Sequence, residues 1–266
     1  MLIFLREVDS LDRMAAWSDL LSVVVSCTPR KRREMKSDRG VKVSPTHEQA
    51  RKVCAAQVID LAQRMLRERL SAGRSGNVSA RLGEGMLITP TGIAADALSA
   101  EMLVYLDGEG RGEPGALLPS SEWRFHQAIY QRRAEAEVIV HTHSPEATAL
   151  ACMGRALPPV HYMIGLLGGD QVPCAHYALF GTQALSDSII EAIGERYHGC
   201  LMEKHGCLAF APSAALAYER VELIEELSKL YLKLLSLGGE VPCLSEAEMV
   251  EVLVQMRDYG QQEIEL

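Results

Sequence analysis

Two histidines separated by a single residue are the first sign of chemistry in this sequence. His141 and His143 end the segment Glu137-Val-Ile-Val-His-Thr-His143, whose short, β-branched and apolar character predicts a central strand. Alternate residues of a strand point to the same face, so both imidazoles could bind one metal ion. The His-x-His pattern is only moderately specific, and two hydrogen-bonded histidines at a strand end are the alternative.

A third histidine lies in another predicted strand. His205 falls within residues 200–210, where apolar residues on both sides predict a strand interrupted at His205-Gly206. A buried imidazole needs a partner, which a metal ion or a hydrogen bond in the core could supply. Gly206 would let another group approach closely. Three histidines with an open fourth position are typical of a catalytic zinc site.

Glu122 is the candidate acid–base residue. It follows Pro119-Ser-Ser121 at the predicted start of a helix that runs to about Arg133, with Ser120 or Ser121 as the cap. A glutamate in a first helical turn commonly interacts with the helix dipole. The functional interpretation is a carboxylate beside the metal that accepts a proton. Spacing alone leaves both interpretations open.

Three turns could bind an anion. They are Gly76-Asn77, Thr91-Gly92 and Ser120-Ser121, each built from small or hydroxyl residues. Such turns present backbone N–H and hydroxyl donors to a phosphate without needing a lysine. Each pattern is weak by itself, because loops are generally rich in these residue types.

Helices and short strands alternate along the chain and must position these residues. Helices are expected from Thr46-x-x-Gln49, at 120–133, from Ser144-Pro145, at 182–196, at 213–236 and from Ser245-x-x-Glu248. Strands are expected at 77–82, 86–89, 102–106, 137–143, 172–177 and 200–210. This alternation predicts an α/β fold, a single-domain αβα sandwich with helices on both faces of its sheet.

The remainder of the chain differs from this pattern. Residues 1–45 contain a basic run at 30–39, and such runs are usually solvated. We therefore expect residues 1–45 to be a poorly ordered N-terminal extension. Residues 46–266 are expected to form the folded domain.

Composition excludes several classes of protein. Apolar residues make up 48% and charged residues 23%, which argues against general disorder. The formal charge of 27 − 35 = −8, without a clustered basic face, predicts no nucleic-acid partner. Seven cysteines without a C-x-x-C pair argue against a disulfide framework and a four-thiolate zinc site. Neither a spanning apolar run nor a signal peptide is evident, so we expect a cytoplasmic protein without a membrane partner.

Seven segments in a fixed order resemble the class II aldolase/adducin family. They are Ser75-Gly-Asn-Val-Ser79, Gly85-Met-Leu-Ile-Thr-Pro-Thr-Gly92, Leu118-Pro-Ser-Ser-Glu-Trp-Arg-Phe-His126, Val140-His-Thr-His143, His161-Tyr-Met-Ile164, Phe180-Gly-Thr182 and His205-Gly206. The resemblance runs from about residue 50 to the C-terminus and is strongest to members that cleave L-fuculose 1-phosphate. It implies that the central sheet is mainly antiparallel.

The resemblance also implies a role for each matching polar residue. One Zn²⁺ ion per subunit would be held by the matching histidines, His141, His143 and His205. Glu122 would ligate the resting metal and then act as the base. The phosphate group would bind at Asn77, Thr91, Gly92, Ser120 and Ser121.

Three aromatic residues match further positions of the family. Tyr162 matches a tyrosine that a neighbouring subunit donates to protonate the aldehyde oxygen, and Tyr259 matches a C-terminal tyrosine that closes over the site. Phe180 matches an aromatic residue placed against the site. The resemblance therefore implies a homo-oligomer, a homotetramer, with its active sites at subunit interfaces.

The implied enzyme is a class II aldehyde-lyase. A ketose 1-phosphate, L-fuculose 1-phosphate by resemblance, would give dihydroxyacetone phosphate and an aldehyde such as L-lactaldehyde. Zinc would supply a Lewis acid, and Glu122 would move the proton. Arg74 stands where the fuculose-type enzymes tend to have a small hydroxyl residue. This departure bears on the substrate and not on the reaction class.

Several alternatives stay open. The same chemistry on 5-deoxyribulose or 5-methylthioribulose 1-phosphate depends on the pocket at the aldehyde end. A pentulose-5-phosphate 4-epimerase shares the fold and the metal, but Tyr162 in its sequence context favours an aldolase over an epimerase or a dehydratase. A non-enzymatic adducin-like module need not keep a metal site, and a structural zinc would have a closed fourth ligand. The three histidines and Glu122 argue against both of these.

Overall fold

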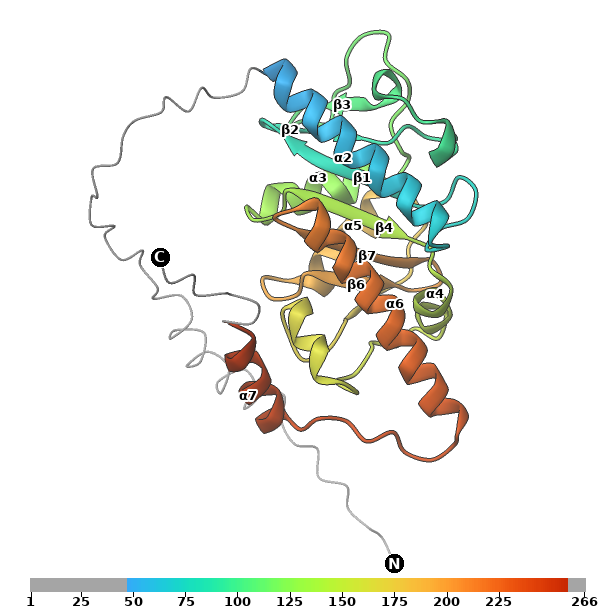
Figure 1. Ribbon diagram of the computed structural model, residues 1–266, viewed down its shortest axis with the longest axis vertical. Coiled ribbons are helices and arrows are strands. Elements are labelled where there is room, and N and C mark those ends of the chain that lie inside the picture. The colour runs from blue at the N-terminus through green and yellow to red at the C-terminus, as the bar shows by residue number, and fades with distance from the viewer. Residues whose placement is uncertain (1–46, 258–266) are drawn as a thin grey trace, which may run out of the picture. The chain divides into compact units, whose positions relative to one another are not determined.

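The structure, a computed structural model, describes residues 47–257 of the chain. Figure 1 shows the arrangement of their helices and strands. The expected extension at residues 1–45 lies outside the described residues, as do Thr46 and Tyr259. The predicted boundary between residues 45 and 46 therefore stays a prediction.

The elements alternate along the chain much as the sequence predicts. The α-helices are α2 (His47–Arg67), α3 (Trp123–Arg132), α4 (Pro145–Cys152), α5 (Gln183–Ile193), α6 (Ala214–Ser236) and α7 (Glu246–Met256). The 3-10 helices are η1 (Ala95–Ala97), η2 (Ala100–Met102) and η3 (Tyr162–Leu167). The strands are β1 (Asn77–Leu82), β2 (Gly85–Ile88), β3 (Val104–Leu106), β4 (Val138–Thr142), β5 (Cys174–Ala175), β6 (Gly199–Met202) and β7 (Gly206–Ala211).

The strands form one mainly antiparallel sheet. Their order is β3-β2-β1-β4-β7-β6-β5. Among the described residues, β5 and β6 pair in parallel, and the other neighbouring strands pair antiparallel. In the antiparallel register, Asn77 of β1 faces His141 of β4, and Thr142 of β4 faces Cys207 of β7. The pairing thus brings the start of β1, the end of β4 and the start of β7 to the same side of the sheet.

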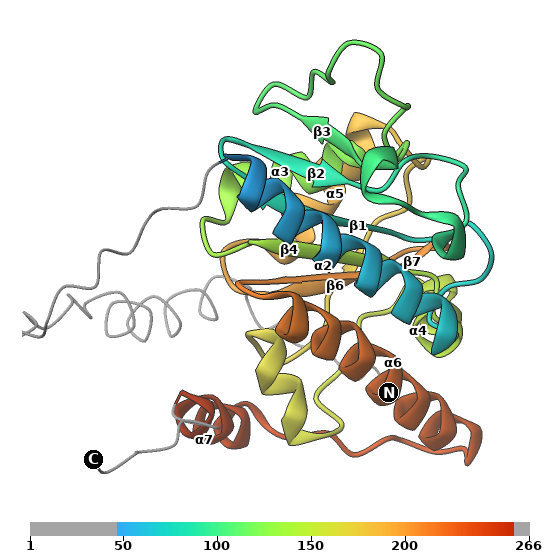
Figure 2. The same cartoon turned by 45° about the horizontal axis from the view of Figure 1, so that its top comes forward.

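Helices cover both faces of the sheet. Side chains of β4 alternate between the two faces, as in any strand: Val138 and Val140 pack in one apolar cluster, and Ile139 packs in the other. Figures 1 and 2 show α2 and α6 crossing one face and α3 and α5 on the other. The predicted αβα sandwich with a central, mainly antiparallel sheet is confirmed.

The start of α3 differs from the prediction that Ser120 or Ser121 caps it. The helix begins at Trp123, and Glu122 is the N-cap residue, although its side chain makes no capping hydrogen bond. The backbone N–H of Trp123 donates to the carbonyl of Ser120 at 3.2 Å. The Glu122 carboxylate is therefore free of the helix backbone and can face the sheet.

The start of α4 is capped from a distance. Ser144 precedes it as predicted, but the Ser144 side chain makes no capping bond. The Glu225 carboxylate of α6 instead accepts the backbone N–H groups of Glu146 and Ala147 at 2.8–3.1 Å. The predicted capping box at Ser245, which starts α7, is present.

None of the helices between residues 47 and 257 combines the length and apolar character that crossing a membrane requires.

Candidate active site

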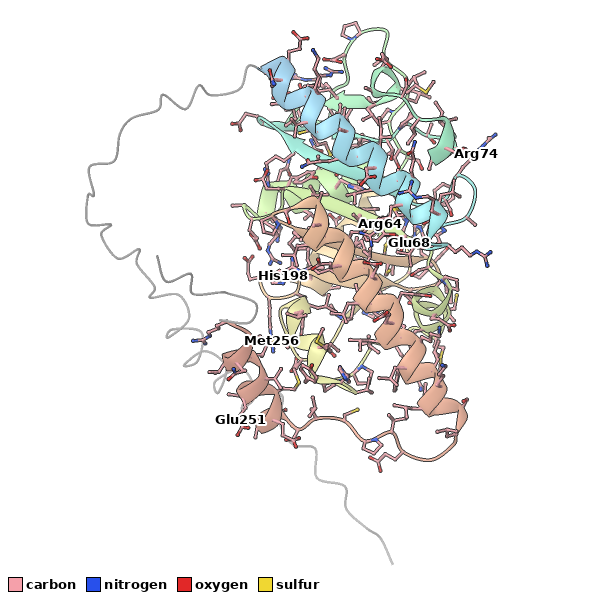
Figure 3. All side chains as sticks on the ribbon, viewed as in Figure 1. Arg64, Glu68, Arg74, His198, Glu251 and Met256 are labelled. Atoms are coloured by element: carbon pink, nitrogen blue, oxygen red, sulfur yellow. The ribbon has the colours of Figure 1, made fainter. Side chains whose placement is uncertain are left out.

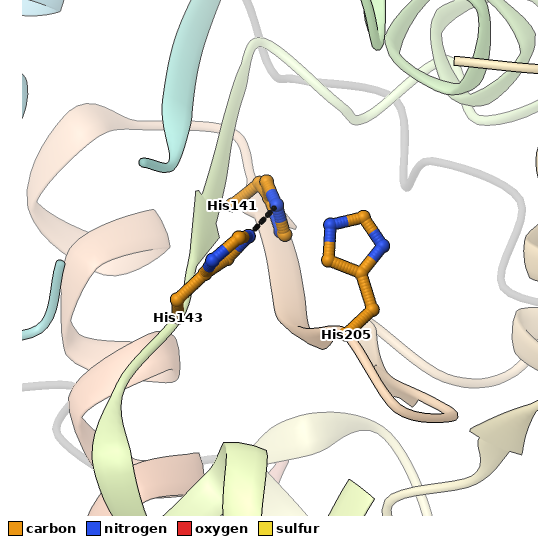
Figure 4. Close-up of side chains that lie close together, drawn as sticks. All are labelled: His141, His143 and His205. Carbon is orange, nitrogen blue, oxygen red and sulfur yellow. Dashed lines mark hydrogen bonds between the residues drawn. The ribbon is translucent and has the colours of Figure 1, made fainter. Parts of the chain in front are cut away.

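The three histidines singled out in the sequence lie together at one edge of the sheet (Figure 4). The ring centroids of His141 and His143 are 4.9 Å apart, and those of His205 lie 4.9 and 5.0 Å from them. One nitrogen from each ring can be chosen so that all three lie within 4.8 Å of one another. The arrangement can hold a metal ion.

A tight hairpin between β6 and β7 brings His205 to the other two. Lys204 has a left-handed φ of 57°, and the N–H of His205 donates to the Met202 carbonyl at 3.0 Å. A three-residue loop with a left-handed residue is a common hairpin geometry. A Cβ on Gly206 would meet the Thr142 carbonyl and lie 3.1 Å from the His143 ring. Glycine at residue 206 therefore permits the close approach of the hairpin to β4.

His141 directs its Nε2 toward the centre of the cluster. Its Nδ1 lies 2.9 Å from the Cys207 carbonyl, which can only accept, so Nδ1 carries the proton. Its Nε2 lies 3.0 Å from Nε2 of His143 and 3.2 Å from Oε2 of Glu122. A backbone carbonyl that fixes the tautomer of an imidazole is typical of metal-ligating histidines.

Burial keeps the other two histidines in the form that binds metals. It lowers the pKa of His143 to about 3, with further lowering from His141 and His205. Burial likewise lowers the pKa of His205 to about 4, again assisted by His141. Both imidazoles are therefore neutral at neutral pH, as metal binding requires.

Glu122 lies beside the three histidines in a buried position. Burial alone would raise its pKa, but His141, His205 and a hydrogen bond from Asn77 outweigh burial and lower it to about 2. Its Oε2 accepts from Asn77 Nδ2 at 3.0 Å, and its Oε1 lies 3.2 Å from Nε2 of His205. Oε1 nevertheless makes no hydrogen bond with any described residue. An ionised carboxylate with an unsatisfied buried oxygen, next to three imidazoles, fits a divalent cation.

A pocket of about 460 Å³ opens above this cluster. Among its lining residues are His143, His205 and Glu122 of the cluster. All five candidate phosphate residues also line it, namely Asn77, Thr91, Gly92, Ser120 and Ser121. The three turns that are separate in the sequence are thus brought to one wall.

Two basic side chains at the pocket were not assigned to the site from the residues alone. Lys204 lines the pocket beside His205 and pairs with Glu203 at 2.6 Å. Its position in the hairpin next to a candidate ligand was the available signal. Arg74 also lines the pocket, is exposed, and projects outward in Figure 3. Both can contribute positive charge near a bound anion.

The aromatic candidates are placed differently from one another. Phe180 lines the pocket and is 61% exposed. Tyr162 begins η3, is 47% exposed, and stacks against His161 with ring centroids 4.7 Å apart. Tyr162 is not among the pocket-lining residues of the described chain. Tyr259 lies outside the described residues.

One buried histidine near the site was missed as a functional residue. His126 of α3 is fully buried, and its Nε2 lies 2.5 Å from Oδ1 of Asn77. It stood within the motif 118–126, but nothing in the sequence connects it to Asn77. Their contact depends on how α3 packs on β1.

Comparisons with known proteins agree with this geometry. The family model for the class II aldolase and adducin N-terminal domain matches residues 56–232. An L-fuculose phosphate aldolase of Escherichia coli (strain K12) is 43% identical over 206 residues, which are 77% of this chain and 95% of the relative. A 5-methylthioribulose-1-phosphate/5-deoxyribulose-1-phosphate aldolase of Escherichia coli O45:K1 (strain S88 / ExPEC) is 40% identical over 206 residues, 77% of this chain and 96% of the relative.

Solved structures show the same fold. An L-fuculose 1-phosphate aldolase matches with a TM-score of 0.73 and 33% sequence identity. The match covers 77% of this chain and 96% of that protein.

Proposed function

The chain belongs to the class II aldolase and adducin family and is a lyase of the class II aldolase type, and we propose that it cleaves a ketose 1-phosphate with a bound Zn²⁺ ion. The products would be dihydroxyacetone phosphate and an aldehyde. The observation that carries the proposal is the meeting of three imidazoles and one ionised carboxylate beside a pocket lined by three anion-binding turns.

The donor set favours zinc. His141, His143 and His205 would hold the ion, and Glu122 is placed to be a fourth ligand while no substrate is bound. Imidazole and carboxylate donors with an exchangeable position are typical of catalytic zinc. When bound, the ion would supply a Lewis acid for the oxygens of the substrate.

Glu122 is the residue placed to move a proton. In the described state, its contacts with His141 and His205 lower its pKa to about 2 against the effect of burial. A substrate that displaced the carboxylate from these imidazoles would leave burial as the larger influence, and its proton affinity would rise. Glu122 could then accept a proton from dihydroxyacetone phosphate in the aldol direction and return it to the same carbon in cleavage.

The phosphate group would bind on the wall formed by the three turns. Ser120 and Ser121 directly precede the N-cap of α3, where backbone N–H groups and the helix dipole favour an anion. Asn77, Thr91 and Gly92 line the same wall. Lys204 and Arg74 would add positive charge at the rim.

Two kinds of substrate fit the proposal comparably. L-Fuculose 1-phosphate would give L-lactaldehyde, and the relative named for it is 43% identical. 5-Methylthioribulose or 5-deoxyribulose 1-phosphate would give an aldehyde with an apolar end, and the relative named for them is 40% identical. Leu179 and Phe180, apolar and exposed at the pocket, could contact the methyl or methylthio end of any of these aldehydes.

We further propose a homo-oligomer, a homotetramer by family resemblance, in which Tyr162 reaches the pocket of a neighbouring subunit. The exposure of Tyr162 and its absence from the described lining of its own pocket support this role. Tyr259 is proposed to close over the site. The cytoplasm stays the predicted compartment.

A panel of ketose 1-phosphates that differ only beyond the cleaved bond tests the function. Zinc-loaded protein is expected to release dihydroxyacetone phosphate, detected by a coupled assay, and the preferred member identifies the aldehyde. A chelator should abolish the release and added zinc should restore it. Tightly bound zinc without release from any member would indicate a structural metal, and epimerisation of a pentulose 5-phosphate would indicate the epimerase.

A further inference from the structure

Five polar side chains interleave between α3 and β1, in a series that starts at the pocket with Glu122 and Asn77 and ends with Tyr130. Glu122 is the N-cap residue of α3, and His126 and Tyr130 follow it at intervals of four residues, so the three lie along one side of the helix at steps of about 6 Å. Asn77 and Ser79 lie on one face of β1, about 6.6 Å apart. The two spacings match closely, and the strand residues fit between the helix residues in the order of their hydrogen bonds.

The direction of every bond in this series follows from its carboxylate end. A carboxylate oxygen accepts, so Nδ2 of Asn77 donates to Oε2 of Glu122 at 3.0 Å. The other face of that amide, Oδ1, must then accept from Nε2 of His126 at 2.5 Å. Burial lowers the pKa of His126 to about 3, so the ring is neutral and its Nδ1 carries a lone pair.

The remaining two bonds follow in the same way. Nδ1 of His126 must accept from the hydroxyl of Ser79, whose oxygen lies 2.7 Å away. Having used its one proton, Ser79 must accept from the hydroxyl of Tyr130 at 2.8 Å. Burial raises the pKa of Tyr130, which keeps this hydroxyl protonated. All four bonds therefore point toward the Glu122 carboxylate.

We propose that His126 is a positioning residue for the reaction: it holds the Asn77 amide in the orientation that donates to Glu122, and it thereby aims the carboxylate. The proposal rests on the function assigned to Glu122 above. An asparagine amide has nearly the same shape after a half-turn, so packing alone does not choose its orientation. Turned over, the amide would place Oδ1 against the carboxylate, and two acceptors would face each other. The N–H of His126 prevents that turn.

Substitutions at residue 126 can separate this role from packing. His126→Asn keeps a polar group near Ser79 but is too short to donate to Asn77. His126→Gln places an amide nitrogen near the position of Nε2 and restores the donor. A matched control is His198→Asn, because His198 is another mostly buried histidine, placed at the opposite end of β6 from His205.

The activity measurement is the exchange of the dihydroxyacetone phosphate carbon-bound proton with solvent, which needs no knowledge of the aldehyde. His126→Asn should slow exchange by on the order of 10- to 100-fold, the usual effect of losing a partner of a ligating group. The variant should keep its bound zinc and its folded circular dichroism spectrum. His126→Gln should recover most of the rate, and His198→Asn should exchange like the unmodified protein.

A measurement on the metal-free full-length protein tests the inference without turnover. ¹⁵N-labelled histidine should show His126 protonated at Nε2, and the Asn77 amide protons should exchange slowly with water. That protection should persist in His126→Gln and disappear in His126→Asn. Protonation of His126 at Nδ1, or equal protection in both variants, overturns the inference.

The outcomes distinguish this inference from the proposed function. Proton exchange without cleavage of any ketose 1-phosphate contradicts the substrate proposal and leaves the comparison at residue 126 valid. No exchange at all in zinc-loaded protein contradicts the function, and the spectra of the metal-free protein then decide the inference. Equal exchange rates in His126→Asn and His126→Gln overturn the positioning role.

Discussion

At the scale of single residues, the site combines an ionised carboxylate with the imidazoles of His143 and His205, which burial keeps neutral. The pKa of Glu122 is lowered to about 2 by His141 and His205 despite burial, whereas burial lowers that of His205 to about 4. The carboxylate and the histidines therefore stay in complementary states over a wide range of pH. Changing the charge of Glu122 without changing its shape separates its proton chemistry from metal binding.

Glu122→Gln is expected to retain metal and lose proton transfer. The three histidines remain as ligands, while an amide cannot accept the proton, so exchange at dihydroxyacetone phosphate should fall by on the order of 10²- to 10⁴-fold. Exchange is measured by NMR in deuterated solvent and bound zinc by elemental analysis. Glu226→Gln, at an exposed position of α6, is the matched control. Unchanged exchange in Glu122→Gln would remove Glu122 from this role.

At the scale of elements, the β6–β7 hairpin and the end of β4 assemble the proposed metal centre. β4 pairs with β7 so that Thr142 faces Cys207, which places the hairpin loop beside His143. Gly206 lies at the contact, where an added Cβ would meet the Thr142 carbonyl. Because a backbone carbonyl in a sheet cannot move aside easily, the spacing of His143 and His205 depends on this glycine.

Gly206→Ala is expected to weaken zinc binding and lower stability. Inserting a methyl group into a closely packed contact typically costs about 1–3 kcal/mol, and here the strain would separate β4 from the hairpin. Zinc affinity is measured by competition with a chelator and stability by urea denaturation. Gly112→Ala is the control, because a Cβ there meets ordinary contacts of 3.6 Å or more. Equal zinc affinity in the two variants would contradict the prediction.

Much of the architecture could be predicted from local patterns. The buried run at β4, the interruption at His205-Gly206 and the capping box at Ser245 each carry a local signal, and each matches an observed boundary. The cap of α3 was predicted incorrectly, because Glu122 is the N-cap residue and its side chain turns toward the histidines. Ser144 is the N-cap residue of α4 as expected, but the capping carboxylate of Glu225 comes from a distant helix. Side chains that arrive from elsewhere in the fold leave no trace in the local sequence.

The candidate site was predictable to a similar extent. His141 and His143 could be paired from strand periodicity, since both lie within β4 and its end. His205 was joined to them by the family resemblance, because local periodicity does not contain the β4–β7 register that brings it close. The contact of His126 with Asn77 could be predicted only from the way α3 packs on β1. These are long-range contacts, and the local patterns of a single sequence do not specify them.

At the scale of the whole molecule, neutral buried histidines couple stability to pH. The pKa of His198 is lowered to about 4, first by burial and then by Arg220 and Arg133, whereas Glu135 opposes the shift. The unfolded chain binds a proton at this histidine below about pH 6.5, and the folded chain does not until about pH 4. His198 therefore contributes stability above pH 6.5 that is lost as the pH falls toward 4.

His198→Asn is expected to flatten the acid side of the stability curve. Metal-free protein should lose free energy of unfolding between pH 6.5 and 4, and His198 should account for at most about 1.4 kcal/mol per pH unit of that loss. Urea denaturation across this range, before and after the substitution, measures the difference. The two proteins should have parallel curves above pH 7. An unchanged slope below pH 6.5 would show that His198 is not kept neutral by the fold.

Subunit assembly is the remaining question at the scale of the whole molecule. The proposed function places Tyr162 at the site of a neighbouring subunit. A Glu122→Gln subunit would then lack the acid–base residue but keep Tyr162, and a Tyr162→Phe subunit would lack the tyrosine but keep Glu122. A hybrid site that combines Glu122 of one subunit with Tyr162 of the other would be intact, whereas a site completed within one subunit would never be.

Co-expression of these two variants should therefore restore cleavage of the preferred ketose 1-phosphate. With equal, random mixing, roughly a quarter of the sites in a cyclic assembly should have both residues intact. Differently tagged subunits allow hybrids to be purified and their release of dihydroxyacetone phosphate to be compared with each parent. Glu122→Gln mixed with His205→Ala is the control, because both residues lie in the same cluster of one chain and no hybrid site is intact. Hybrids as inactive as their parents, or a fully active monomer in sedimentation, would place Tyr162 outside the neighbouring site.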